Sequence, residues 1–218
     1  MLLVRGERIL NIQNDRINWG SHIPVLKSLF QTYNIKGAVE LGMGYNSTPL
    51  LRENCEKVYS TENDLAWVEL MKKEFGETEN HRIEYHDISP CVKSTRRRSV
   101  GKPFLEKMRD YYLSIDTEGY DLLFVDGHSV TRLEAFLTIG DRFDFVVLHD
   151  VNEQGLINHY LTDMPQLLGY SRFVHKPFRQ HTGLYMKEQY VSEIEKFESI
   201  LQKETIDFGK RQSIFGKW

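Results

Sequence analysis

Acidic and imidazole side chains stand where four apolar runs of this chain end. The acids are Glu40, Glu62, Asp126 and Asp150, and the histidines His128 and His149 stand beside the last two. Carboxylates accept protons from hydroxyl or ammonium groups and can ligate metals, whereas an imidazole can take up a proton near neutral pH. These residue types therefore predict a polar ligand site with acid–base capacity.

The first of these acids opens a glycine loop, Glu40-Leu41-Gly42-Met43-Gly44, which runs into Asn46-Ser47-Thr48-Pro49. Two glycines followed by helix-capping residues predict a sharp turn from a strand into a helix, with backbone N–H groups free to face a ligand. An acid at the strand end favours a cation and disfavours a phosphate. The loop is therefore expected to suit a nucleoside that carries an ammonium group more than a pyrophosphate.

The elements that must position these residues alternate between strands and helices. Apolar residues between turn signals predict strands over residues 36–41, 57–61, 82–85, 121–125 and 143–148. The unbroken apolar runs within the last two favour parallel strands that are buried on both faces. Apolar residues at helical spacing predict helices that begin at residue 23, at residue 47 or 48, and at residue 64. The same spacing predicts helices around residues 105–115, 154–161 and 190–201. Residues 171–175 and 183–187 are expected to form a hairpin at the sheet edge. We predict an α/β fold: a doubly wound sheet, mostly parallel with an antiparallel edge hairpin strand and helices on both faces.

The chain is expected to form one domain over residues 1–218. Within it we predict an N-terminal helical segment (1–35), an insert or lid (89–118) and a tail (205–218). The tail combines aromatic and basic residues and could dock on a partner subunit or on the domain's own surface, or be disordered. A homodimer is a possible assembly.

Composition excludes several classes of protein. The net charge of −3 argues against a nucleic-acid partner, which normally requires a basic excess. The two cysteines, Cys55 and Cys91, provide neither a disulfide framework nor a metal-type spacing. Charged residues within the first ten and the absence of a long apolar window predict no secretion signal and no membrane span. We therefore expect a cytoplasmic location and no membrane partner.

Ligands of open parallel sheets bind outside the carboxyl ends of the strands, where these acids lie. With that placement, the chain resembles the class I S-adenosylmethionine-dependent methyltransferases, which are Rossmann-like, over about residues 20–190. The resemblance implies that Glu40, Gly42 and Gly44 line the methionine part of the cofactor, together with the capping residues Asn46, Ser47 and Thr48. It also implies that Glu62 accepts both ribose hydroxyls and that Asp87-Ile88 meets the adenine.

Each of these acids has an alternative interpretation. Glu40 could cap the adjacent helix, Glu62 could belong to the acidic first turn of its helix, and Asp87 could be an ordinary loop residue. The glycine loop also partly fits a nicotinamide oxidoreductase, but that fingerprint needs a third glycine where Ser47 stands.

The catalytic candidates are Asp126, His128, His149 and Asp150, with Asp126 also adjoining the cofactor. Either histidine could serve as a general base for a hydroxyl acceptor. Asp126 and Asp150 also resemble the paired metal ligands of the metal-dependent O-methyltransferases. There an asparagine usually follows the second aspartate, whereas here Val151 follows and Asn152 comes next, so a divalent metal stays an open alternative. His22 could reach the same cleft from the N-terminal helix.

The preferred function is methyl transfer to oxygen of a small hydroxylated acceptor, such as a sugar or glycan. The basic run Arg96-Arg97-Arg98 could bind a phosphate of the acceptor or could be a solvated loop. A binding module that keeps the cofactor cleft without turnover, acting through a partner, is the alternative from another class.

Overall fold

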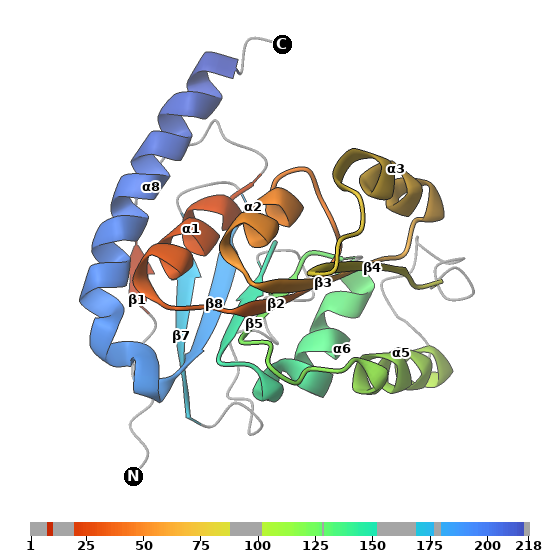
Figure 1. Ribbon diagram of the computed structural model, residues 1–218. Coiled ribbons are helices and arrows are strands. Elements are labelled where there is room, and N and C mark those ends of the chain that lie inside the picture. Colours follow the sequence, from red (N-terminus) through yellow and green to blue (C-terminus); the bar gives the residue numbers. More distant parts are fainter. Residues whose placement is uncertain are drawn as a thin grey trace.

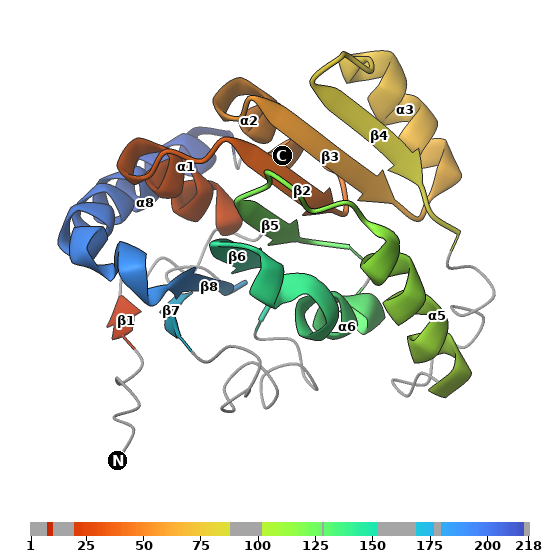
Figure 2. The same cartoon turned by 60° about the horizontal axis from the view of Figure 1, so that its bottom comes forward.

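The computed structural model describes residues 8–10, 20–87, 102–127, 129–151, 169–176 and 180–215. These residues form three layers, with one twisted sheet between two groups of helices (Figures 1 and 2). The strands are β1 (Arg8–Leu10), β2 (Gly37–Leu41), β3 (Lys57–Glu62), β4 (His81–Tyr85), β5 (Leu122–Val125), β6 (Phe145–Leu148), β7 (Tyr170–His175) and β8 (Thr182–Lys187).

The described strands make an eight-stranded sheet in the order β1-β7-β8-β6-β5-β2-β3-β4. All neighbouring pairs are parallel except those of β8, which runs antiparallel to both β6 and β7. The chain moves outward from β2 in one direction to β3 and β4, and in the other to β5 and β6. The carboxyl ends of β2 and β5 therefore form the topological switch point, which is where open sheets of this kind bind ligands.

Helices cover both faces of the sheet. They are α1 (His22–Thr32), α2 (Ser47–Asn54), α3 (Leu65–Phe75), α5 (Lys102–Ser114), α6 (Ser129–Ile139) and α8 (Ile194–Phe215), with 3-10 turns η1 (Gly140–Arg142) and η3 (Glu188–Glu193). In Figure 1, α1, α2 and α3 lie above the sheet, α8 runs along the left side next to α1, and α5 and α6 lie below the sheet. The two faces have separate apolar cores, one under α1, α2 and α8 and one under α5 and α6. A smaller cluster joins α3 to β4.

Local signals account for several helix ends. Asp64 caps α3, because its carboxylate accepts the backbone N–H of Trp67 at 3.1 Å, and Gly76 ends the helix with a φ of +68°. The second helix begins at Ser47, one of the two predicted starts, with Asn46 as N-cap, so Pro49 is its third residue. Ser28 donates to the carbonyl of Pro24 within α1 at 2.7 Å.

The structure refines several sequence predictions. The predicted hairpin is confirmed as the antiparallel pair β7 and β8, and the short strand β1 extends the sheet beyond it. Because β1 pairs with β7, the segment 1–35 contains a strand as well as α1. The helix predicted around residues 105–115 is α5, which packs on α6 as part of the crossover from β4 to β5. The predicted tail is helical as far as Phe215, because α8 continues through it.

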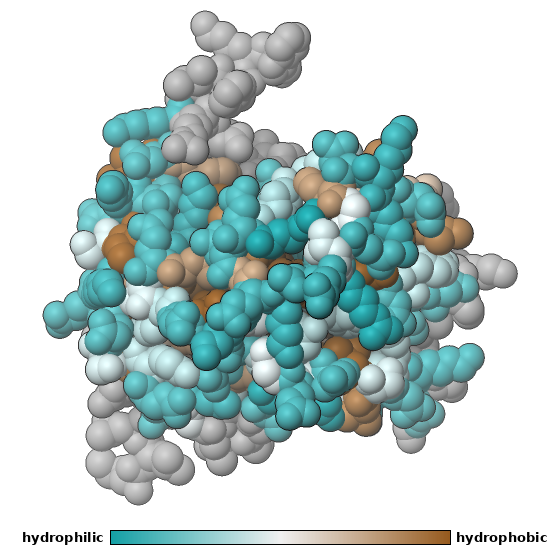
Figure 3. Space-filling model, in the orientation of Figure 1, coloured by the Kyte–Doolittle hydropathy of each residue, from teal (hydrophilic) through white to brown (hydrophobic). Residues whose placement is uncertain are grey.

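The face in Figure 3 is mostly hydrophilic, and its hydrophobic side chains lie in separate small patches. Large apolar residues exposed on the described part of the chain include Tyr45, Leu65 and Leu70. None of the described helices combines the length and the apolar composition needed to cross a membrane.

Candidate functional site at the switch point

The loop from β2 to α2 passes closely over the end of β5. Gly42 has a φ of +98°, and a Cβ there would lie 2.3 Å from the backbone nitrogen of Gly127. Its own N–H donates to the carbonyl of Thr61 at 2.8 Å. Only glycine can occupy this position, since the obstructing atoms are backbone. Gly44 is different, because its backbone is ordinary and the nearest atom to an added Cβ is Ser47 Oγ at 3.6 Å.

Glu40 is fully buried beneath this loop. One of its oxygens accepts hydrogen bonds from Ser60 Oγ at 2.7 Å and Thr48 Oγ1 at 2.9 Å. Ser60 stands opposite Glu40 on β3, and Thr48 lies in the first turn of α2. The carboxylate thus ties β2, β3 and α2 together and holds the loop from below, while direct contact with a ligand ammonium stays a prediction.

A pocket lies at the ends of β2 and β3, beside α5. Gly42, Glu62, His86, Tyr111 and Gly127 are among its lining residues. Glu62 Oε1 accepts the backbone N–H groups of Asn63 and Asp64 at 2.6 and 3.2 Å. Burial raises the pKa of Glu62, and the hydrogen bonds from these N–H groups and from Met43 counteract that rise. The carboxylate is therefore held in one orientation at the pocket edge.

An aromatic pair forms another wall of this pocket. The rings of His86 and Tyr111 are stacked, with centroids 3.3 Å apart and planes inclined by 8°. The Tyr111 hydroxyl donates to Thr61 Oγ1 at 2.9 Å, which orients the ring. A flat aromatic wall near a fixed carboxylate suits a nucleoside, whose base can stack and whose ribose hydroxyls can donate.

Charged side chains converge next to the pocket, at the ends of β5 and β6. Arg132 on α6 donates to Asp150 Oδ2 at 3.0 Å and lies 3.1 Å from Asp126 Oδ1. It also donates to the carbonyls of Gly127 and His149 at 2.8 and 2.9 Å. His149 Nδ1 lies 2.8 Å from Asp126 Oδ1. Although burial alone would raise the pKa of Asp126, the hydrogen bond and charge of His149, followed by the charges of His22 and Arg132, lower it.

His22, in the first turn of α1, completes this cluster. Its ring lies edge-on to that of His149, with centroids 4.5 Å apart. Burial lowers the pKa of His22 to about 3, helped by His149 and opposed by Asp126. Neither ring nitrogen of His22 has a hydrogen-bond partner among the described residues, and the same holds for Nε2 of His149. The cluster therefore presents buried imidazole nitrogens without hydrogen-bond partners among the described residues, beside a carboxylate.

Comparison with known proteins rests on structure, since no protein-family model and no curated protein matches the sequence. SMU.1697c of Streptococcus mutans, provisionally named a methyltransferase and crystallised with SAH (S-adenosylhomocysteine), superposes with a TM-score of 0.54. The two chains are 11% identical, and the match covers 78% of this chain and 99% of that one. An rRNA methylase of Streptococcus thermophilus matches with a TM-score of 0.50 and 15% identity, over 74% and 93% of the chains.

The chain has the class I methyltransferase fold. The resemblance stated from the glycine loop and the strand-end acids is thereby confirmed at the level of the fold. The strand order and the single antiparallel strand β8 agree with that assignment.

The methyltransferase fold brings several predicted site residues together. Gly42 and Glu62 line the pocket, and Asp126, His149 and Asp150 meet at Arg132. Ser47 and Thr48 are buried in the first turn of α2, and Asn46 precedes them without a side-chain capping bond. Asp87 lies exposed beyond β4. His128, Ile88, Asn152, the basic run 96–98 and the predicted helix 154–161 lie outside the described residues.

Arg132 is the functional residue that sequence reasoning missed. Its guanidinium bonds both members of the aspartate pair Asp126 and Asp150, where a bridging cation was predicted. This contact does not test the metal prediction for the pair. Arg132 already neutralises part of the negative charge that such an ion would neutralise. No local sequence pattern marked it, because both aspartates lie on other elements.

Glu40 makes the stability of this methyltransferase fold depend on pH. Burial is the main cause that raises its pKa to about 7, from an ordinary value of 4.5. A carboxyl with a raised pKa stabilises the folded state fully below pH 4.5, and that contribution is lost as the pH rises through 7. We expect Glu40→Gln to raise the free energy of unfolding at pH 8 by up to roughly 3 kcal/mol, with little change at pH 4.5.

Urea unfolding of wild type and Glu40→Gln at both pH values measures this difference. Glu53→Gln, an exposed carboxyl on α2, is the matched control and should behave as wild type. An equal effect of Glu40→Gln at both pH values would show that the carboxyl does not titrate in this range.

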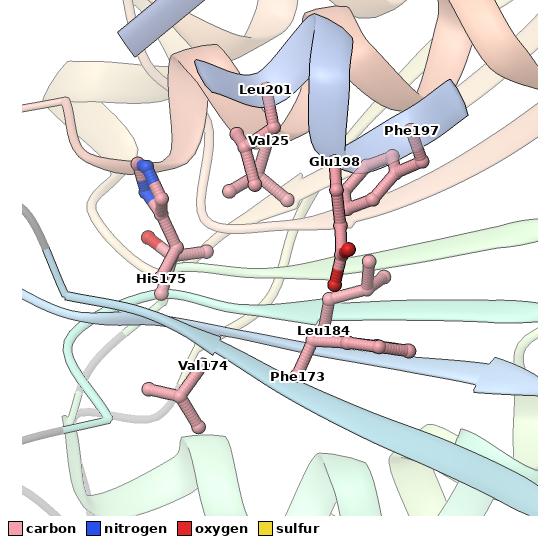
Figure 4. A pocket seen from close by; sticks show the side chains of 9 residues that line it. Val25, Phe173, Val174, His175, Leu184, Phe197, Glu198 and Leu201 are labelled. Atoms are coloured by element: carbon pink, nitrogen blue, oxygen red, sulfur yellow. The ribbon is translucent and has the colours of Figure 1, made fainter. Parts of the chain in front are cut away.

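A second pocket lies between α1, α8 and the strands β7 and β8 (Figure 4). Apolar side chains such as Val25, Leu184 and Phe197 line most of it. His175 stands at one end, where its Nε2 bonds Thr205 Oγ1 at 2.9 Å. The hydrogen bond anchors α8 to the sheet, so we interpret His175 as a structural residue.

Proposed function

We propose that this protein is an S-adenosylmethionine-dependent methyltransferase that methylates an oxygen of a small hydroxylated acceptor, such as a sugar or glycan. The observation that carries the proposal is the Asp126–His149 pair, which lies at the switch point beside the pocket formed by the glycine loop and Glu62. A donor site and a base are thus adjacent.

The pocket supports the choice of donor. Glu62 offers a fixed carboxylate for ribose hydroxyls, and the stacked His86 and Tyr111 offer a surface for a purine. The acids Glu40 and Asp126 give this end of the sheet a negative character that suits a sulfonium and an ammonium group. The loop at Gly42 lies directly against the backbone at the end of β5, with no room for a side chain between them.

The acid–base pair supports the choice of acceptor atom. In the displacement, the acceptor oxygen bonds to the methyl carbon while the carbon–sulfur bond breaks, which leaves S-adenosylhomocysteine. The hydroxyl proton must leave, and a neutral His149 can accept it. Asp126 next to Nδ1 orients the ring and stabilises the imidazolium that forms. Such a base is of less use to an amine acceptor that is already deprotonated.

Cofactor binding is tested by titration calorimetry with S-adenosylhomocysteine. We expect Glu62→Ala to lose roughly 1.5–3 kcal/mol of binding free energy, which is about 10- to 150-fold in affinity, because its charge-assisted hydrogen bonds are lost. Glu69→Ala, an exposed residue of α3, is the matched control and should bind as wild type. Unchanged affinity in Glu62→Ala would remove this carboxylate from the cofactor site.

Turnover is tested by methyl release from labelled S-adenosylmethionine across libraries of sugars, glycans and other hydroxylated acceptors. Transfer to a hydroxyl supports the proposal, and cofactor binding without transfer to any acceptor favours the binding module. Transfer only to RNA would overturn the acceptor class, although a net charge of −3 does not favour that partner. Thermal protection by NAD and not by S-adenosylhomocysteine would revive the oxidoreductase. A cytoplasmic location and a homodimer are also part of this proposal.

A further inference from the structure

The strongest unexplained feature is the polar cluster of His22, Asp126 and His149. One ligand atom from each side chain lies within 4.8 Å of the other two, in the part of the chain that the structure describes. Both histidines are about 4% exposed, whereas Asp126 keeps 24% of its side chain exposed. The cluster thus has a closed side and an open side.

Unpartnered nitrogens distinguish this cluster from an ordinary structural network. Both nitrogens of His22 and Nε2 of His149 are buried without a hydrogen-bond partner among the described residues. Leaving a buried polar group unsatisfied costs about 1–3 kcal/mol, so three such atoms in one place need an explanation. His175, by contrast, has its Nε2 bonded to Thr205.

The charges around the cluster also favour a cation. Two carboxylates, Asp126 and Asp150, share the single guanidinium of Arg132, which leaves one negative charge in excess when the histidines are neutral. A proton on an imidazole or a bound cation can compensate that charge.

We infer that His22, His149 and Asp126 form a binding site for a divalent transition-metal ion. Two imidazole nitrogens and one carboxylate oxygen suit ions such as Zn²⁺, Co²⁺ or Fe²⁺, whereas Mg²⁺ and Ca²⁺ prefer oxygen ligands alone. Ligand atoms around a tetrahedral ion are about 3.4 Å apart, so binding requires the three side chains to approach by no more than about 1.4 Å.

Three protein ligands leave at least one coordination position open. The exposed side of Asp126 indicates that this position faces the end of β5, next to Gly127 in the pocket wall. If the proposed methyltransferase function holds, an acceptor oxygen could occupy it and lose its proton more readily to water, and His149 would then serve as a ligand and not as the general base. Only this last step rests on the proposed function, because the ligand set stands without it.

The experiment uses the purified full chain, stripped with a chelator and titrated with Co²⁺, Zn²⁺ and Mg²⁺ separately. We expect one equivalent of Co²⁺ with a visible absorption band, displaced by Zn²⁺ and not by Mg²⁺. His22→Ala and His149→Ala should each weaken Co²⁺ binding on the order of 100-fold or more. His175→Gln, which replaces a buried histidine outside the cluster, should leave it unchanged.

Wild type that binds no Co²⁺ or Zn²⁺ would overturn the inference, as would binding that survives both alanine variants. His22→Gln keeps a polar side chain in case His22→Ala fails to fold, and it should also lose the metal. S-adenosylhomocysteine affinity is measured on the same samples. Cofactor binding without metal refutes the metal site alone, and metal binding without cofactor refutes the methyltransferase proposal alone.

Discussion

Gly42→Ala is expected to lower the melting temperature by roughly 6–20 °C. The added Cβ would lie 2.3 Å from the nitrogen of Gly127 and 2.5 Å from the carbonyl carbon of Asp126. Both atoms are backbone at the end of β5, so no side chain can rotate away, and the φ of +98° adds strain. Clashes of this kind cost about 3–5 kcal/mol, and a domain of this size loses about 2–4 °C per kcal/mol.

The same substitution should weaken S-adenosylhomocysteine binding by roughly 100-fold if the proposed function is right. The added Cβ would force the loop away from β5 and so away from the ligand. The loss of two hydrogen bonds between the loop backbone and the ligand is enough for a 100-fold change in affinity. Calorimetry at a temperature well below the melting point separates lost affinity from unfolding.

Gly44→Ala is the matched control for stability, because it adds the same methyl group to the same loop. Its Cβ would meet only Ser47 Oγ at 3.6 Å, and its backbone is ordinary. We expect its melting temperature to stay within a few degrees of wild type. Equal melting temperatures for the two variants would show that the close crossing of the loop and β5 does not constrain the fold.

The strands were predictable because burial on both faces leaves unbroken apolar runs in the sequence. The runs within residues 121–125 and 143–148 became β5 (Leu122–Val125) and β6 (Phe145–Leu148), which are buried along their whole length. Parallel strands place their carboxyl ends at one edge of the sheet. The order of the predicted strands along the chain was therefore enough to predict that Asp126 lies near His149 and Asp150. Gly42 was predicted as a turn residue, although its contact with Gly127 depends on neighbouring strands.

Features created by tertiary contact could not be read from the sequence. β1 has only three residues and exists through its pairing with β7. Glu40 was predicted at the ligand because it ends a strand, but its burial depends on the register that sets it opposite Ser60 and below Thr48. No local pattern reveals that register.

Arg132 illustrates the same limit at the candidate site. Its partners, Asp126 and Asp150, lie at the ends of two different strands, 6 residues before it and 18 after it in the sequence. Only the parallel packing of β5 on β6, with α6 crossing below, brings the three together. The arginine therefore had no periodic or motif signal that would assign it a role.

Arg132→Met should destabilise the fold by about 3–5 kcal/mol, because it leaves the buried carboxylate of Asp150 and the partly exposed carboxylate of Asp126 without their cation. The carbonyls of Gly127 and His149 would lose their donor as well. Urea unfolding measures the change, and the midpoint should fall without a large change in slope. Arg82→Met is the matched control, because Arg82 pairs with Glu84 at 3.0 Å but is 72% exposed in its side chain. Its loss should cost no more than about 1 kcal/mol.

A second substitution distinguishes the loss of charge balance from the loss of packing. Asp150→Asn in the Arg132→Met background removes one of the two uncompensated charges while it keeps the side-chain volume. If charge is the cause, the double variant should be more stable than Arg132→Met alone, because the lone remaining carboxylate, Asp126, still has His149 at 2.8 Å. A double variant no more stable than the single one would show that Arg132 acts through packing and its carbonyl contacts. The electrostatic account of the cluster would then be wrong.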